Sequence, residues 1–171
     1  GPNDSGPYQQ VKDDPDWIDF MLECLSRNNL ESSQLVFELT ETYLIEDFAI
    51  CEQQLIRLRT LGFKLLIDDF GVGYSSLGYL SKLPVDGVKL DRALIADIES
   101  SLAMQSMIRN ITRMSHDLNL KVVAEGVETA YQCELIKKLG CDYIQGYYYS
   151  EPLEQDDFCN YLSHFNSQGA Q

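Results

Sequence analysis

The sequence is poor in basic residues and histidine, and it has no long apolar run. Its 171 residues include 13 lysines and arginines against 27 aspartates and glutamates, so the formal net charge is −14. Non-specific nucleic-acid binding depends on basic residues, and this balance argues against a nucleic-acid partner. A small phosphate ester can still bind if metal ions offset the negative field. No apolar run approaches the ~20 residues of a membrane span, so we expect no membrane contact by this domain.

The usual histidine and cysteine metal motifs are also missing. His116 and His164 stand alone, which argues against a histidine-based centre. The cysteines are odd in number and lack zinc-site spacing, so we interpret all five as reduced thiols of a cytoplasmic domain: Cys24, Cys51, Cys133, Cys141 and Cys159. The small, polar start of the chain does not resemble a signal peptide, which fits the same interpretation.

Helix-like and strand-like stretches alternate along the chain, as in the βα units of a parallel sheet. Short apolar runs predict strands at 35–39, 63–67, 88–90, 121–124 and 143–145. Helical spacing predicts helices between these strands and a last helix over 154–165. We expect one domain at 14–165, with tails at 1–13 and 166–171.

Polar side chains stand at the end of every predicted strand. They are Glu38 with Glu41, Asp68 with Asp69, Lys89 with Asp91, Glu125 with Glu128, and Gln145. Ligand sites of parallel α/β folds lie at the carboxyl ends of the strands, so these residues are expected to share one site. Carboxylates without histidine or thiolate suit hard cations such as Mg²⁺ or Mn²⁺. Two such ions bridged by one aspartate would favour in-line displacement at phosphorus.

The pair Asp68-Asp69 at the tip of a buried strand is the most informative feature. Two adjacent carboxylates repel each other unless a metal ion or a lysine lies between them. Lys89 could orient an attacking water or offset charge in the transition state. From the spacing alone, a plain ion pair is an equally good interpretation of Lys89.

Six ordered segments resemble one family. They are Glu38-Leu39-Thr40-Glu41, Asp68-Asp69-Phe70-Gly71-Val72-Gly73-Tyr74-Ser75-Ser76-Leu77, Leu83-Pro84-Val85-Asp86, Lys89-Leu90-Asp91, Val123-Ala124-Glu125-Gly126-Val127-Glu128-Thr129 and Gln145-Gly146-Tyr147. In this order and spacing they resemble the EAL family of bacterial cyclic di-GMP phosphodiesterases. The resemblance implies an α/β fold of the modified TIM-barrel type, incomplete in this chain, with about five βα units visible.

The resemblance implies a metal site and a catalytic lysine. Glu38 and Asp68 would hold a first Mg²⁺ or Mn²⁺ ion, and Asp68 would bridge to a second ion held by Asp69. Glu125 would support that second ion and take part in catalysis with Asp68. Lys89 would contact the nucleophilic water.

The resemblance also implies residues around the metals. Gln145 and Asp91 would bind the substrate, cyclic di-GMP. Glu41, together with Glu128, would anchor the loop over 69–76, which the family couples to substrate binding and dimerisation.

Two expected metal ligands do not match. The sequence contains no Glu-Ala-Leu motif. Asn3-Asp4-Ser5 has the letters of the family's Asn-x-Ser motif, but no strand precedes it and it stands too far from Glu38 for the usual spacing. A complete barrel needs ~250 residues, so we expect only the C-terminal two-thirds of one here.

Two functions follow from this pattern. The first is two-metal hydrolysis of cyclic di-GMP to linear pGpG, weak or absent in this chain alone. The alternative is a non-catalytic cyclic di-GMP sensor or protein-interaction module. We also expect an attached sensor or GGDEF domain, and a homodimer, because open strand edges pair with other chains. Without the first strands of the barrel, the inner layer of side chains would lose its cover. We therefore expect an exposed apolar patch that includes four residues: Phe37, Leu66, Val88 and Val123.

Overall fold

The computed structural model describes residues 17–40, 48–70, 77–146 and 153–154. The chain divides into two compact units. Among the described residues, the first unit comprises those up to 67 together with 77–86, and the second comprises 68–70 and those from 87 onward. The boundary falls within one strand, so the acidic end of that strand belongs to the second unit.

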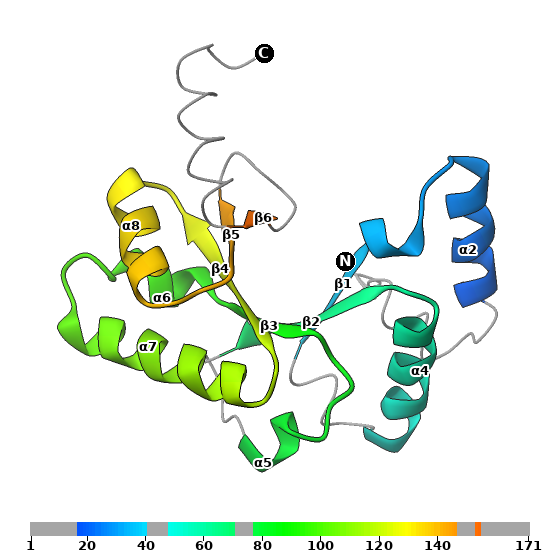
Figure 1. Ribbon diagram of the computed structural model, residues 1–171, viewed down its shortest axis with the longest axis horizontal. Coiled ribbons are helices and arrows are strands. Elements are labelled where there is room, and N and C mark those ends of the chain that lie inside the picture. Colours follow the sequence, from blue (N-terminus) through cyan, green and yellow to red (C-terminus); the bar gives the residue numbers. More distant parts are fainter. Residues whose placement is uncertain (1–16, 41–47, 71–76, 147–152, 155–171) are drawn as a thin grey trace, which may run out of the picture. The chain divides into compact units, whose positions relative to one another are not determined.

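The first unit, whose elements run from blue (α2) to green (α5) in Figure 1, is built around aromatic side chains. Its elements are α2 (Trp17–Arg27), the short 3-10 helix η1 (Ser32–Gln34), β1 (Val36–Thr40), α4 (Phe48–Thr60), the start of β2 (Lys64–Phe70) and α5 (Leu77–Leu80). The Phe37 ring of β1 packs edge-on against Trp17 at 5.5 Å and against Phe63 at 5.2 Å between ring centroids. Such pairs stabilise a core beyond the apolar area they bury, so α2 and β1 are joined through these rings.

The second unit alternates strands and helices. Its elements are the end of β2, then β3 (Gly87–Leu90), α6 (Arg92–Ala96), α7 (Leu102–Asp117), β4 (Lys121–Val127), α8 (Ala130–Lys138), β5 (Tyr143–Gly146) and β6 (Leu153–Glu154). Strands β3, β4 and β5 pair in parallel, and β6 pairs antiparallel to β5. Helices α6, α7 and α8 all pack against β4 (Figure 1). The predicted α/β alternation with a parallel sheet is therefore confirmed.

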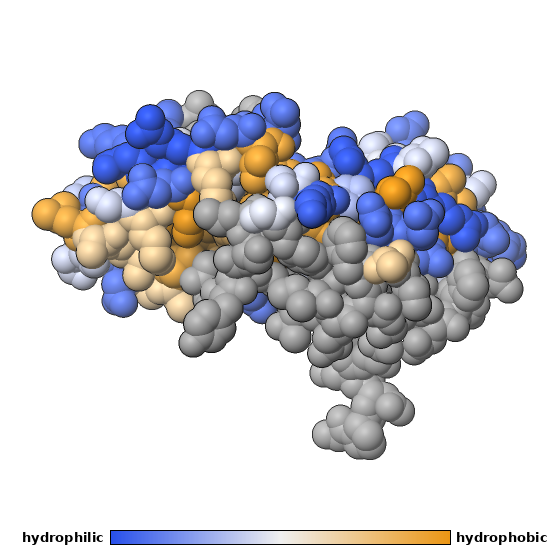
Figure 2. Space-filling model, turned by 90° about the horizontal axis from the view of Figure 1, so that it is seen from below, coloured by the Kyte–Doolittle hydropathy of each residue, from blue (hydrophilic) through white to orange (hydrophobic). Residues whose placement is uncertain are grey.

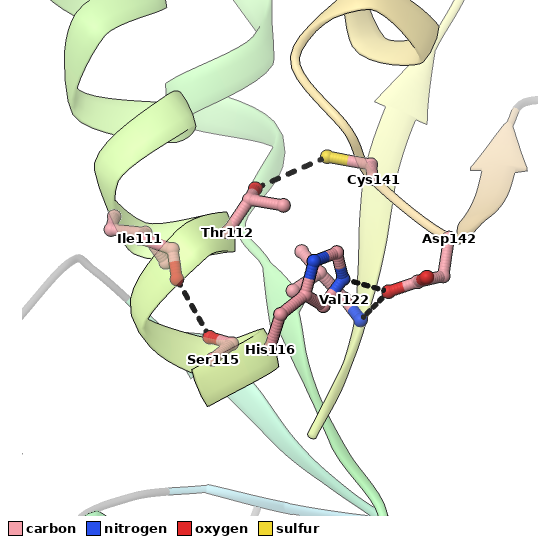
Figure 3. A network of polar contacts seen from close by, with 7 residues as sticks. All are labelled: Ile111, Thr112, Ser115, His116, Val122, Cys141 and Asp142. Carbon is pink, nitrogen blue, oxygen red and sulfur yellow. Dashed lines mark hydrogen bonds and ion pairs between the residues drawn. The ribbon is translucent and has the colours of Figure 1, made fainter. Parts of the chain in front are cut away.

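An aspartate before a strand sets the strand register in each unit. Asp142, before β5, donates its N–H to the carbonyl of Val122 and accepts the Val122 N–H at 2.8 Å. Figure 3 shows the same carboxylate 2.7 Å from the Nε2 atom of His116 on α7. Asp86, before β3, makes the same reciprocal pair with Leu65, at 2.8 and 2.9 Å. Both aspartates therefore join the amino ends of neighbouring strands.

The expected exposure of the inner layer is wrong. Its four members are at most 7% exposed: Phe37, Leu66, Val88 and Val123. For Phe37 the cause is packing within its own unit, because two aromatic rings cover it. The visible surface mixes hydrophilic and hydrophobic residues (Figure 2). Leu102 at the start of α7 is the most exposed large apolar side chain described, at 79%.

Strand ends differ from the sequence prediction. Strand β2 continues through Asp68 and Asp69 to Phe70, and β4 continues through Glu125. The acidic residues therefore lie within strands rather than in the loops that follow, because backbone pairing continues past the last apolar residue. The predicted helix does not begin at Glu154, which pairs with Tyr143 in β6. Residues 155–165 lie outside the described part.

The cysteines are not all reduced thiols. Cys133 is disulfide-bonded, so that expectation is wrong for this residue, whose neighbours in space the sequence spacing could not show. Cys24 and Cys141 are free. Burial raises the pKa of the Cys141 thiol to about 12, so this residue stays neutral at ordinary pH. No helix in the described ranges combines the length and the apolar character needed to cross a membrane.

Candidate metal centre

Three carboxylates from two strands converge in the second unit. Asp68 and Asp69 come from the end of β2, and Glu125 comes from β4. Each offers an oxygen atom within 4.8 Å of the other two. Two oxygens on opposite sides of an ion bound at ~2.1 Å lie ~4.2 Å apart, so this spacing is close to that of a shared cation site. We call these three residues the acid cluster.

Lys89 lies between two members of the acid cluster. Its side chain on β3 is buried, with 4% of its surface exposed. The Nζ atom lies 3.9 Å from Oδ1 of Asp68 and 3.8 Å from Oε2 of Glu125. Both distances exceed that of a hydrogen bond, so it is charge attraction that links the ammonium to these two carboxylates.

Asp69 has an unusual backbone conformation. Its φ is +55°, a left-handed value that aspartate tolerates better than most residues do. The Asp69 N–H donates to Oδ1 of Asp68 at 2.8 Å, which fixes the two carboxylates relative to each other. Burial, the Asp68 charge and a hydrogen bond with the carboxyl group of Asp91 raise the pKa of Asp69. Without a metal ion, the surroundings of Asp69 therefore disfavour its ionised form, and a bound cation would favour that form.

Glu125 lies where the pairing of β4 becomes irregular. It is in register with Gln145 of β5, and the pairing then shifts before Val127 is reached. Burial raises the pKa of Glu125, and the charge of Lys89 acts in the opposite direction. Gln145 is half-buried and is the register partner of Glu125, and its role at the site stays a prediction.

The roles of four other predicted site residues stay predictions, and one of them, Asp91, contacts the acid cluster through its hydrogen bond with Asp69. Asp91 follows β3 and caps α6, because its Oδ2 accepts the Ala93 N–H at 2.9 Å. Glu128 is exposed before α8. Glu38 is half-buried on β1 of the first unit, so its approach to the acid cluster stays a prediction. Glu41 lies outside the described residues, as does most of the loop at 69–76.

Sequence reasoning gave no role to Arg92 or to Gly126. Arg92 is the first residue of α6, and its charge acts on Glu125 by lowering its pKa against the larger effect of burial. Gly126 directly follows Glu125 and has a φ of +78°. The signal in the sequence for this backbone conformation was the glycine next to an acid at a strand end.

The donor set fits a hard divalent cation. All three groups offer carboxylate oxygen, and among the described residues no histidine or cysteine joins the cluster. Burial is the main cause of the raised pKa values of Asp69 and Glu125, and the charge of Asp68 adds to both. Mg²⁺ and Mn²⁺ are the ions that such oxygen ligands favour. The fold and site together define an α/β protein with an oxygen-donor site near the carboxyl ends of its strands.

Comparison with known proteins identifies the family. The family model of the EAL domain matches residues 7–152. The chain belongs to the EAL domain family. The cyclic di-GMP phosphodiesterase NbdA of Pseudomonas aeruginosa is 43% identical over 136 residues, which cover 80% of this chain and 17% of that protein. The chain spans about a fifth of the length of the curated relatives it matches, 17% to 19% for the first three.

Comparison with solved structures leads to the same family. The MucR phosphodiesterase in complex with c-di-GMP has a TM-score of 0.72 and 35% identity, with 87% of this chain and 60% of that chain covered. The BlrP1 protein of Klebsiella pneumoniae, in a manganese and cyclic di-GMP complex at pH 6, has a TM-score of 0.73 and 35% identity. That match covers 85% of this chain and 37% of the other. The α/β fold of the modified TIM-barrel type predicted from the sequence agrees with these neighbours.

Replacing Asp69 by asparagine is expected to stabilise the metal-free protein at neutral pH. The folded state holds the Asp69 proton more tightly than the unfolded chain does, so stability is lost as pH rises from about 4 through the raised pKa. Asparagine tolerates the same φ and cannot ionise, so it removes this loss. The gain at pH 7 should be at most about 1 kcal/mol, because solvent screens this exposed group.

Urea unfolding in EDTA at pH 7 and below pH 4 measures this effect. The gain should vanish at the lower pH, where Asp69 is protonated in both states. Asp97→Asn, an exposed site after α6, is the matched control and should show little change. A loss of stability in Asp69→Asn at both pH values would contradict the interpretation.

Proposed function

We propose that this chain is part of a cyclic di-GMP phosphodiesterase domain that opens its substrate to linear pGpG by two-metal hydrolysis. The observation that supports this most strongly is the acid cluster with a buried lysine between its members. Membership of the EAL domain family and the names of the relatives NbdA and MucR support the substrate.

Each residue of the site has a role in this proposal. Asp68, Glu38, Asp69 and Glu125 would hold two Mg²⁺ or Mn²⁺ ions, with Asp68 shared between them, Glu38 on the first ion, and Asp69 and Glu125 on the second. When bound, these ions supply an activated water and neutralise charge at phosphorus. Lys89 would hold the attacking water in line with the phosphorus, since its buried ammonium lies within 4 Å of two carboxylates of the acid cluster.

The other site residues bind and orient the substrate. Gln145, half-buried beside Glu125, donates or accepts hydrogen bonds at the pocket wall. Asp91 contacts the substrate from the first turn of α6, whose start it caps. Glu41 and Glu128 anchor the loop at 69–76.

The chain alone is proposed to be weakly active or inactive. It contains no Glu-Ala-Leu motif, so one expected ligand glutamate is not supplied. A missing ligand leaves the metal loosely held and its water poorly activated. The same observation favours the second candidate, a non-catalytic sensor of cyclic di-GMP or an interaction module.

One experiment separates the two candidates. The purified chain, and a longer version with the N-terminal part of the domain from the parent gene or from NbdA, are incubated with cyclic di-GMP and Mn²⁺. Chromatography should show pGpG at enzyme rates from the longer version and at least about 100-fold less from the chain alone. Tight binding without pGpG in both samples would instead establish a sensor.

The proposal extends to the parent protein. The relatives are about five times longer than this chain, which leaves room for an attached sensor or GGDEF domain. We propose a homodimer, as expected from the sequence. Its expected contact through an open edge at β5 is wrong, because β6 pairs with that edge. The cytoplasmic location also stays a prediction.

A further inference from the structure

Gly126 is the extra residue in the pairing between β4 and β5. Glu125 pairs with Gln145 and Val127 pairs with the very next residue of β5, so Gly126 bulges out of the ladder. Its φ of +78° suits glycine and strains other residues. The bulge directly follows Glu125 and therefore controls where the carboxylate of Glu125 points.

The space next to Gly126 is filled by the first residue of α6. A methyl group at position 126 would lie 2.5 Å from Cβ of Arg92 and 3.2 Å from its Cα. Real Cβ atoms do not approach so closely, and the nearest atoms belong to the backbone and the first side-chain carbon, which no rotamer change can move. One of the two segments would have to shift.

Helix α6 is held more firmly than the bulge. Asp91 caps its start through the Ala93 N–H, and Leu94 and Ile95 are buried at 6% and 0% exposure. Moving the helix would break this cap and open a gap in a close-packed core. The pairing of β4 with β5 is already irregular at Gly126, so a side chain there would displace this part of β4 and carry Glu125 away from Lys89.

We propose that Gly126 and the backbone of Arg92 form a positioning contact that holds Glu125 in the acid cluster. Gly126 is a positioning residue, since it acts through Glu125 and touches no reacting group. This inference rests on the proposed function, because it assumes that the acid cluster binds a divalent cation. It adds α6 to the strands that build the site.

Gly140 provides a matched control within the same unit. Its φ is +93°, so alanine there is strained in the same way. A methyl group at position 140 would lie 3.4 Å from the Cγ2 atom of Thr112, an ordinary contact. Gly140 follows α8 at the amino end of β5, away from Glu125. Both Gly126→Ala and Gly140→Ala therefore strain the backbone, and Gly126→Ala alone of the two adds a steric clash.

Calorimetric titration with Mn²⁺ tests the proposal on the whole chain. Gly126→Ala should lower Mn²⁺ affinity by about 10- to 100-fold, the usual effect of disturbing the support of a ligand. Gly140→Ala should stay within about threefold of the original chain, a change of less than 1 kcal/mol. Arg92→Gly removes the atom that makes the closest clash. In the Arg92→Gly background, Gly126→Ala should therefore lower Mn²⁺ affinity less than it does in the original chain.

The outcomes separate this inference from the proposed function. No Mn²⁺ binding by the unaltered chain would overturn both. Binding that Gly126→Ala retains, or that Gly140→Ala loses equally, would overturn the positioning contact alone. If Gly126→Ala does not fold, circular dichroism of the double variant decides. Restored folding and Mn²⁺ binding support the contact, and an unfolded double variant beside a folded Gly140→Ala overturns it.

Discussion

Replacing Asp68 by asparagine is expected to abolish measurable Mn²⁺ binding by this chain. Asp68 is a member of the acid cluster, with a carboxylate oxygen within 4.8 Å of oxygens of both Asp69 and Glu125, and it lies 3.9 Å from the Nζ atom of Lys89. Disturbing a residue that merely supports a metal ligand lowers affinity by about 10- to 100-fold, so losing a ligand itself should lower it by ~100-fold or more. The amide keeps the volume and can still accept the Asp69 N–H.

Isothermal titration of both proteins with Mn²⁺ measures this loss. Asp97→Asn removes one negative charge from the same unit at an exposed position, and it should bind Mn²⁺ like the unaltered chain. Affinity within threefold of the original in Asp68→Asn would show that the ion binds elsewhere.

The second large effect is expected at Lys89. In the longer, active version of the domain, Lys89→Met should lower kcat by about 100- to 1000-fold, the usual effect of losing one donor to a transition state. Methionine keeps an apolar stem in a position that is 3% exposed, so the fold should be retained. Mn²⁺ affinity should not fall, because a positive charge beside two carboxylates is removed.

This split between turnover and metal affinity identifies the role of Lys89. A plain ion pair would change stability and leave kcat within a few-fold of the original. Lys121→Met, at the exposed start of β4, serves as the control and should change neither quantity. Unchanged kcat in Lys89→Met would remove Lys89 from the mechanism.

The alternation of strands and helices was predictable, because apolar periodicity records burial directly. The runs around Leu65 and Val123 predicted strands, and both residues are buried there. The ends of the strands were less predictable. Backbone hydrogen bonding carries β4 past Glu125, and the pattern of side chains does not report it. The short strand at Glu154 arises from pairing with a distant segment, and its sequence alone suggested a helix.

The acid cluster was predictable for a related reason. Parallel strands present their carboxyl ends on one side, so acids at several strand ends are expected to meet. The convergence of Asp68, Asp69 and Glu125 follows from that rule. The contact between Gly126 and Arg92 could not be predicted, because it depends on a bulge and on the close approach of a helix. The disulfide of Cys133 likewise depends on a distance in space that spacing along the chain does not contain.

The most direct test of the metal centre is anomalous diffraction from crystals grown with Mn²⁺ and cyclic di-GMP. The account predicts a manganese peak within about 2.3 Å of carboxylate oxygens from Asp68 and Asp69, with Glu125 bound directly or through one water. A phosphate of the ligand should lie against the same ion. Crystals that hold cyclic di-GMP with no manganese at the acid cluster, or with manganese only at other carboxylates, would contradict the account.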